Sequence, residues 1–281
     1  MGKRGATRTV RIHRHRDGVA TREKDAVAVE EPLEIRVSWT DGGTRRTEAL
    51  SVTMRTPGDD FDLVAGFLHG EGVASVTDDV QELTYCRSGE AAQDYNVVEA
   101  RLGPGATFDA DRLRRNFYTS SSCGVCGKAS LESVEAAGCE MLPDDGFTIG
   151  IDLLKELPGL LGKGQGVFDR TGGLHAAGLF DVTGRCRALR EDVGRHNAVD
   201  KVLGHAFLRS GLPARERILV VSGRTSFEIV QKAVTAGVPC LVAVGAPSSL
   251  AVDLAVRFNQ TLVGFARDGG FNVYAGLERI Q

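Results

Sequence analysis

The chain has 281 residues, of which 42% are hydrophobic and 25% charged, and its formal net charge is -3. Such a composition is typical of a globular protein with a sizeable core, and the small net charge gives no electrostatic sign of a nucleic-acid partner. No apolar run approaches the roughly 20 residues of a membrane helix, and the N-terminus lacks the apolar core of a signal peptide. We therefore expect a cytoplasmic protein that binds neither nucleic acid nor membrane. Six cysteines are too few for a disulfide framework at this length.

Residues 1–30 are basic and poorly periodic. We expect them to form a disordered, solvated tail. The alternative is an electrostatic arm for an acidic partner, and the sequence does not decide between the two.

Residues 31–118 have the pattern of a small α+β domain. Alternating stretches at 33–39 and 48–55 flank Asp41-Gly42-Gly43, which predicts a β-hairpin. A helix is expected next, with its apolar residues on one face and glycines past its end. The stretches VQELTYC and NVVEARL predict two further strands.

Residues 119–130 form a glycine- and serine-rich loop with a Cys-x-x-Cys motif, and residues 131–281 form a second domain. Its patterns follow the order α-β-β-α-β-α-β-α-β. This alternation predicts an α/β domain with a mostly parallel sheet and helices on both faces.

Three strand-to-helix turns of this second domain should cluster, because ligands of such sheets bind outside the carboxyl ends of the strands. The turns read REDVGRHN, SGRTSFE and GAPSSLA. Two carry arginine (Arg195, Arg224), and Thr225 and Ser226 stand where a helix begins, which suits an anionic ligand. The alternative is that these residues are ordinary caps and turns. No P-loop fingerprint is present.

The motif SSSCGVCGKAS leaves three chemistries open for Cys123 and Cys126. A structural zinc site needs four ligands, usually in two spaced pairs, and here there is one pair. A thioredoxin-like motif belongs at a helix N-terminus, whereas serines and glycines surround this one. A nucleophilic sulfur needs the thiolate, which Lys128 and the upstream Arg114 and Arg115 would favour.

Five motifs in this order resemble the FdhD/NarQ family of formate dehydrogenase accessory sulfurtransferases, over most of the chain after about Glu30. They read SSSCGVCGKAS, GLHAAGLF, REDVGRHNAVDKV, VSGRTSFEIVQKA and LVGFARDGGFNVY. The resemblance implies an enzyme that takes sulfur from a cysteine desulfurase as a cysteine persulfide. It passes the sulfur to the molybdenum or tungsten bis-guanine-dinucleotide pterin cofactor that formate dehydrogenase requires.

Carried over to this sequence, Cys123 would hold the persulfide and Cys126 would be its partner. The alternative is a non-catalytic chaperone of the cofactor with structural or redox cysteines. The cofactor-binding stretch of the family matches Phe265, Ala266, Arg267, Asp268, Gly269 and Gly270. On its own, RDGG is equally typical of a hairpin turn, and the basic residue that the family usually shows near Gly270 is missing.

The resemblance also implies a cytidine-deaminase-like fold for the second domain. Deaminases carry His-x-Glu and Pro-Cys-x-x-Cys at two helix starts, and the equivalent places here are His196-Asn197-Ala198 and residues 222–226. The glutamate has become Ala198 and the zinc cysteines are missing. We therefore expect no catalytic zinc, and a vacated pocket in which Arg224, Thr225 and Ser226 hold phosphate. A zinc deaminase with unusual ligands is the weakest alternative.

His175 and His196 are either packing histidines or members of this pocket. Asp192 either binds guanine through its carboxylate or caps the helix at Gly194. We expect a homodimer, because symmetric dimers are common among cytoplasmic enzymes.

Overall fold

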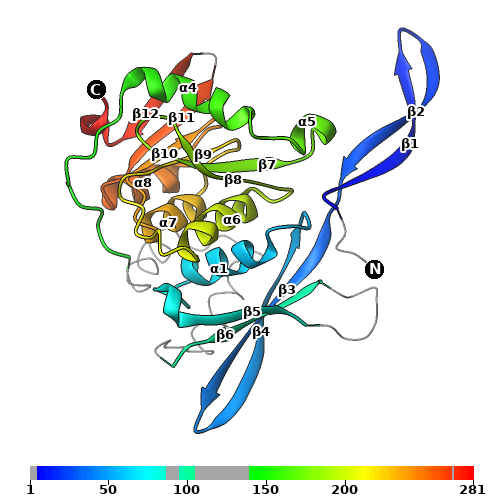
Figure 1. Ribbon diagram of the computed structural model, residues 1–281. Coiled ribbons are helices and arrows are strands. Elements are labelled where there is room, and N and C mark those ends of the chain that lie inside the picture. The colour runs from blue at the N-terminus through cyan, green and yellow to red at the C-terminus, as the bar shows by residue number, and fades with distance from the viewer. Residues whose placement is uncertain (1–4, 87–94, 105–138, 268) are drawn as a thin grey trace.

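The computed structural model describes residues 5–86, 95–104, 139–267 and 269–281. The strands in these ranges form three separate sheets of two, four and six strands (Figure 1). Helices cover both faces of the largest sheet, so the predicted α/β class is confirmed.

The four-stranded sheet has the order β4-β3-β6-β5 and packs against helix α1. Its elements are β3 (Glu31–Asp41), β4 (Thr44–Arg55), α1 (Asp60–Gly70), the short η1 (Thr77–Asp79), β5 (Val80–Tyr85) and β6 (Val97–Leu102). Alternate residues of β3 (Leu33, Ile35 and Val37) are fully or almost fully buried against α1. Gly42 and Gly43 both have positive φ, as the tight turn of the predicted β3–β4 hairpin requires.

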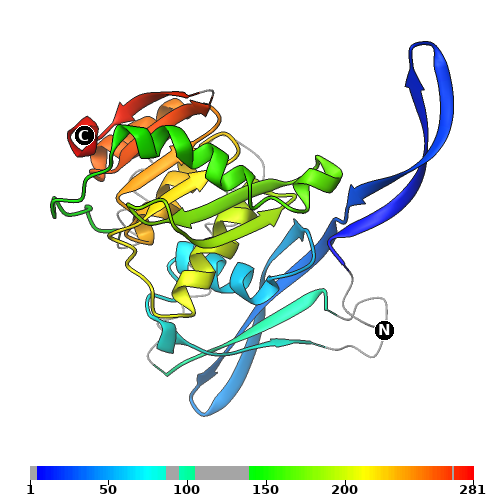
Figure 2. The ribbon, with the colours of Figure 1, turned by 45° about the horizontal axis from the view of Figure 1, so that its top comes forward.

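The N-terminal segment is not the disordered tail that the sequence predicts. Strands β1 (Thr7–Arg16) and β2 (Val19–Ala28) pair antiparallel over their whole length, and the hairpin extends away from the other two sheets (Figures 1 and 2). The turn between them is Asp17-Gly18, both with positive φ, which is a strong hairpin signal. Basic residues on both faces of β1 obscure the alternation from which a strand would be predicted.

The six-stranded sheet has the order β12-β11-β10-β9-β7-β8. Its strands are β7 (His175–Phe180), β8 (Cys186–Asp192), β9 (Ile218–Val221), β10 (Cys240–Ala243), β11 (Thr261–Arg267) and β12 (Gly270–Ala275). Strands β9, β10 and β11 are parallel neighbours, whereas β7 is antiparallel to β8 and β9, and β12 to β11. The sheet is therefore mixed, and the expected parallel pairing holds only in its middle, because a hairpin closes each side. The order of elements predicted from the sequence ends at β11 and does not include β12.

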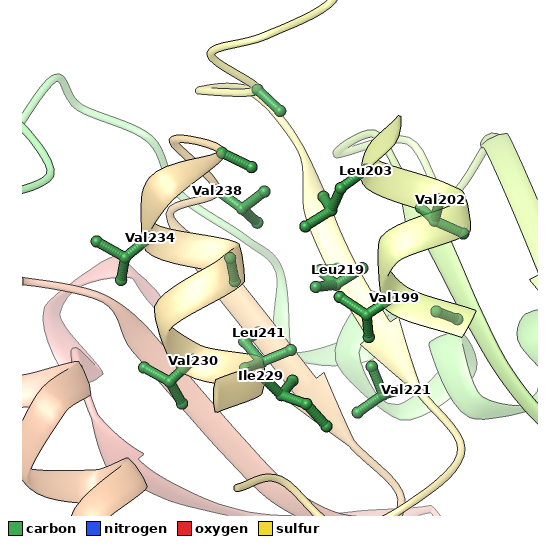
Figure 3. Close-up of a cluster of buried hydrophobic side chains, with 14 of the residues drawn as sticks. Val199, Val202, Leu203, Leu219, Val221, Ile229, Val230, Val234, Val238 and Leu241 are labelled. Atoms are coloured by element: carbon green, nitrogen blue, oxygen red, sulfur yellow. The ribbon is translucent and has the colours of Figure 1, made fainter. Parts of the chain in front are cut away.

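Two apolar layers cover this sheet. The helices are α4 (Ile151–Gly162), the short α5 (Phe168–Thr171), α6 (Arg195–Phe207), α7 (Phe227–Thr235) and α8 (Ser249–Arg257), and the short η2 (Leu277–Arg279) lies near the C-terminus. Leu219 and Val221 of β9 point to the layer formed by α6, α7 and α8 (Figure 3). Ile218 and Val220 point to the layer that contains α4. Strand β9 is thus buried on both faces, which explains its uninterrupted apolar sequence.

Helices α1 and α6 join the two larger sheets through backbone contact. A Cβ atom on Gly66 would lie 1.9 Å from the carbonyl oxygen of Asp200, and one on Gly204 would lie 1.9 Å from that of Asp62. Only glycine allows this approach. Phe207, at the end of α6, belongs to the core beneath the four-stranded sheet.

Among the described residues, no helix has the length and apolarity that a membrane crossing demands. The deaminase-like form of the large sheet stays a prediction.

Candidate functional site at the strand ends

The predicted strand-to-helix turns lie side by side at one edge of the large sheet. The amide of Gly245 donates to the carbonyl of Gly223 at 3.1 Å, and the amide of Phe265 donates to the carbonyl of Gly245 at 3.1 Å. A β-bridge joins Thr225 to Pro247. The ends of β9, β10 and β11 therefore form a continuous backbone surface next to the starts of α7 and α8.

Two glycines allow this close approach. A Cβ atom on Gly245 would lie 2.8 Å from the oxygen of Gly223 and 2.9 Å from the nitrogen of Arg224. A Cβ atom on Gly223 would lie 3.3 Å from Nδ1 of His175 and 3.8 Å from Cβ of Arg195. The second turn therefore also touches the start of β7 and the start of α6.

His196 connects the first turn to the second. Its Nε2 lies 2.9 Å from Oγ of Ser226 and 3.2 Å from Oε2 of Glu228. Burial, and then the positive charges of Arg195 and Lys232, lower the pKa of His196 to about 4. The imidazole is therefore neutral at pH 7, and its contact with Glu228 is not an ion pair at that pH. Glu228 is not among the site residues that the sequence predicts, although it follows Ser226 by two positions.

His175 opens β7 and pairs with Asp192 across the β7–β8 hairpin. Burial lowers its pKa, and the charge of Arg195 lowers it further. His175 and His196 are thus both neutral at pH 7, and both lie at this edge of the large sheet. Its positive charge comes from Arg195, Arg224 and Arg267, of which the last two are exposed.

Two buried polar atoms at this edge have no hydrogen-bond partner among the described residues. They are Oγ1 of Thr225 and Nε of Arg195. Thr225 is 1% exposed, and its backbone is occupied by the carbonyl of Ala246 and the amide of Ser248. An unsatisfied buried hydroxyl costs about 1–3 kcal/mol. An anionic ligand with phosphate oxygens would satisfy both groups, so these residues fit the ligand class that the sequence suggests.

Asp192 does not reach this surface. Its buried carboxylate accepts hydrogen bonds from the amide of Gly194 at 2.8 Å, from Nδ2 of Asn197 at 3.0 Å and from the amide of Thr56 at 3.1 Å. It also forms an ion pair with Lys201 at 2.6 Å. Both oxygens are thus engaged within the chain, one of them by the amide of Gly194 just before α6. The contact with Thr56 spans 136 positions of the chain, so sequence reasoning had no signal for it.

The predicted stretch 265–270 runs from the end of β11 to the first residue of β12, where Arg267 pairs with Gly270. Phe265 has a positive φ of 52° and lies in an irregular part of the ladder. Its ring is 38% exposed, and the guanidinium of Arg267 lies 6.0 Å from the ring centre. Ala266 is buried in the core below and offers no side chain to a ligand. Asp268 lies outside the described residues.

Cys123 and Cys126 also lie outside the described residues. The other four cysteines are free, and burial raises the pKa of each thiol, that of Cys240 to about 12. None of these four environments favours the thiolate. In the described parts of the chain, His, Cys, Asp and Glu side chains form no cluster of three suited to a metal ion. Ala198, which stands where deaminases have glutamate, is fully buried.

Comparison with known proteins gives consistent results over the whole chain. A "Sulfur carrier protein FdhD" of Mycobacterium tuberculosis is 50% identical over 285 residues, covering 100% of both chains. Proteins of the same name from Streptomyces avermitilis and Sulfurisphaera tokodaii are 49% and 40% identical, covering 100% and 96% of this chain and 97% and 98% of theirs.

A crystal structure of a protein from Desulfotalea psychrophila, assigned as a formate dehydrogenase accessory protein, matches with a TM-score of 0.75 and 25% identity. The match covers 98% of this chain and 100% of that one. The model of the FdhD/NarQ family matches residues 28–281. The chain therefore belongs to the FdhD/NarQ family.

Proposed function

We propose that this protein is a sulfurtransferase that serves formate dehydrogenase. It receives sulfur as a persulfide on Cys123 from a cysteine desulfurase. It delivers that sulfur to a molybdenum or tungsten bis-guanine-dinucleotide pterin, which it binds as a substrate. The observation that carries the proposal is the full-length similarity to proteins named sulfur carriers. The accessory protein of similar fold supports formate dehydrogenase as the final recipient.

The environments of the four described cysteines leave the sulfur chemistry to Cys123 and Cys126. The Cys123 thiolate attacks the outer sulfur of the desulfurase persulfide. A new S–S bond forms on Cys123, the old S–S bond breaks, and the desulfurase leaves as a thiolate. Cys126, three positions further along the sequence, shares or resolves the persulfide. The four described cysteines, with raised pKa values, are poor nucleophiles at neutral pH.

The strand-end site would hold the guanine-dinucleotide part of the substrate. Arg195 and Arg224 neutralise pyrophosphate, while the hydroxyl of Thr225 and the amides at the start of α7 donate hydrogen bonds to it. His175 and His196, which are neutral in the free protein, contribute hydrogen bonds. The exposed ring of Phe265 offers a flat surface for a purine. The bound pterin supplies the metal that receives the sulfur.

Intact mass spectrometry after incubation with a cysteine desulfurase and L-cysteine tests the proposal. We expect a gain of about 32 Da, one persulfide sulfur, that is lost in Cys123→Ala. Cys186→Ala is the matched control, because Cys186 is an exposed free cysteine with a raised pKa, and it should load like the wild type. Absence of loading in the wild type would overturn the sulfurtransferase and favour the non-catalytic chaperone.

A second readout separates these two functions in cells. A strain without its own copy of the gene is complemented with wild type or Cys123→Ala, and formate dehydrogenase activity is measured. The sulfurtransferase requires that Cys123→Ala fail to restore activity although its affinity for guanosine diphosphate is normal. A chaperone would restore activity with either version.

A further inference from the structure

Glu228 is an unexpected residue at a site for anions. It belongs to the first turn of α7, and its side chain is 53% exposed. Its Oε2 lies 3.2 Å from Nε2 of His196, which also lies 2.9 Å from Oγ of Ser226. A carboxylate in the first turn stabilises the helix, but it would also repel the phosphates of a ligand that binds at the same helix start.

The groups suited to phosphate lie next to this carboxylate. Ser226 directly precedes α7, but its hydroxyl does not cap the helix and contacts His196 instead. The neighbouring hydroxyl of Thr225 is buried without a partner among the described residues, and the same holds for Nε of Arg195 beside His196. An anion that satisfies these two groups must therefore bind close to both His196 and Glu228.

Helices α6 and α7 lie side by side on the large sheet (Figure 3) and contact each other through two pairs of polar side chains. His196 and Asp200 are one turn apart on α6, and Glu228 and Lys232 are one turn apart on α7. Asp200 and Lys232 are both buried and form an ion pair at 2.8 Å. Their charges balance each other, whereas Glu228 faces an imidazole that is neutral at pH 7.

A bound pyrophosphate would change the charge balance at His196. In the free protein, burial and then the charges of Arg195 and Lys232 keep the pKa of His196 at about 4. Pyrophosphate brings negative charge that neutralises Arg195 and favours a proton on the neighbouring imidazole. An imidazolium donates from both ring nitrogens, so it can hold a phosphate and Glu228 at once. The charged and titratable groups around His196 are Arg195 and Asp200 of its own helix, Glu228 and Lys232 of α7, and His175 of β7.

From these contacts we propose that His196 takes up a proton from solvent when a pyrophosphate enters the strand-end site, and that the imidazolium then joins the phosphate to Glu228. The inference rests on the ligand site of the proposed function, but not on sulfur transfer by Cys123. Because ligand and proton bind together, the ligand binds more tightly as the pH falls and is released as the pH rises.

Calorimetry with diguanosine pyrophosphate tests the proposal. This probe has no terminal phosphate, so it does not titrate near pH 6 as guanosine diphosphate does. Titrations at pH 6 in MES and in bis-Tris, which differ in ionisation enthalpy, give the number of protons bound with the ligand. In the wild type we expect at least about half a proton per site, and an affinity that rises by up to about tenfold from pH 7 to pH 6.

His196→Gln removes the titrating ring and keeps a side chain that can donate a hydrogen bond. We expect this variant to bind the probe without proton uptake and with an affinity that is the same at pH 7 and pH 6. The matched control is His205→Gln, because His205 lies at the other end of α6, where it contacts Asp62. This control should take up protons like the wild type.

Two calorimetric results would overturn the proposal and leave the sulfurtransferase standing. Proton uptake that persists in His196→Gln would assign the proton to Asp200 or His175. A wild type that binds the probe without proton uptake would show that His196 stays neutral. A wild type that does not bind the probe would refute the strand-end site as well, whereas persulfide loading of Cys123 would still be decided by mass spectrometry.

NMR titration of the histidine side chains in the wild type covers the case in which His196→Gln does not fold. The ring of His196 is identified by its contact with Ser226. At pH 6 it should have the chemical shift of a neutral imidazole without the probe, and that of an imidazolium at saturation with the probe. A shift that stays neutral at saturation would refute the uptake of a proton by His196.

Discussion

Replacing Gly204 with alanine would force helices α1 and α6 apart. The new Cβ atom would lie 1.9 Å from the carbonyl oxygen of Asp62 and 2.5 Å from the amide nitrogen of Gly66. Both obstacles are backbone atoms of α1, so no side chain can rotate away. The helices would have to separate by about 1.5 Å for ordinary van der Waals contact, which loosens the side chains packed beside them.

The magnitude follows from two opposing effects. Overpacking of a well-packed interior costs about 1–3 kcal/mol, and a rigid backbone obstacle belongs at the upper end of this range. Alanine in place of glycine within a helix raises the free energy of unfolding by about 1 kcal/mol, because alanine has the higher helix propensity. We therefore expect Gly204→Ala to lower the free energy of unfolding by about 2 kcal/mol, which corresponds to a fall in Tm of about 4–8 °C.

Denaturant titration and calorimetry measure this change. The control is Gly159→Ala in α4, since a Cβ atom there would meet no heavy atom within 4 Å, and this variant should be neutral or up to about 1 kcal/mol more stable. If Gly204→Ala were as stable as Gly159→Ala, the contact between the two helix backbones would not be as close as described.

Two further predictions concern the strand-end site, and a third concerns the buried carboxylate of Asp192. Thr225→Val removes the unpartnered hydroxyl without changing the shape of the side chain. We expect stability to rise by about 1–3 kcal/mol, because the unsatisfied hydroxyl is gone, and guanosine diphosphate to bind about tenfold more weakly by calorimetry. Unchanged affinity would contradict the role of Thr225. The pKa of His196 is about 4 in the folded protein and about 6.5 in the unfolded chain. The unfolded state therefore binds more protons in this window, and stability falls as the pH drops from about 6.5 towards 4. In His196→Gln the decline of the urea midpoint between pH 7 and pH 5 should be shallower than in the wild type. His69 and His175, whose pKa values are also lowered, account for part of what remains, and an equally steep decline would refute this origin. Asp192→Ala leaves the buried ammonium of Lys201 without its carboxylate and should cost about 3–5 kcal/mol in denaturant titration. A loss below about 1 kcal/mol would mean that this ion pair does not hold α6 to the β4–α1 connection.

Local patterns predict those parts of the fold whose residues interact with near neighbours in the chain. The uninterrupted apolar run of β9 and the alternation of β3 reflect burial on two faces and on one face, respectively. The grouping of the strand-end turns could also be predicted, because parallel strands place their carboxyl ends together. It is confirmed by the bridge between Thr225 and Pro247.

Features that depend on distant contacts could not be predicted. The carboxylate of Asp192 accepts a hydrogen bond from the amide of Thr56. Thr56 directly follows β4 of the four-stranded sheet, whereas Asp192 ends β8 of the six-stranded sheet. The bulged backbone at Phe265 depends on its hydrogen bond to Gly245 of the neighbouring strand end. The β1–β2 hairpin was mistaken for a tail because charged residues occupy both faces, although Asp17-Gly18 marks its turn.

Helix α6 makes the two larger sheets one cooperative unit. Val199, Val202 and Leu203 belong to the core of the six-stranded sheet, whereas Phe207 of the same helix belongs to the core of the four-stranded sheet. Neither core can melt without exposing part of the other. The body should therefore unfold in a single calorimetric transition whose van't Hoff and calorimetric enthalpies agree. A ligand that binds at the start of α6 would then raise the melting temperature of both sheets together.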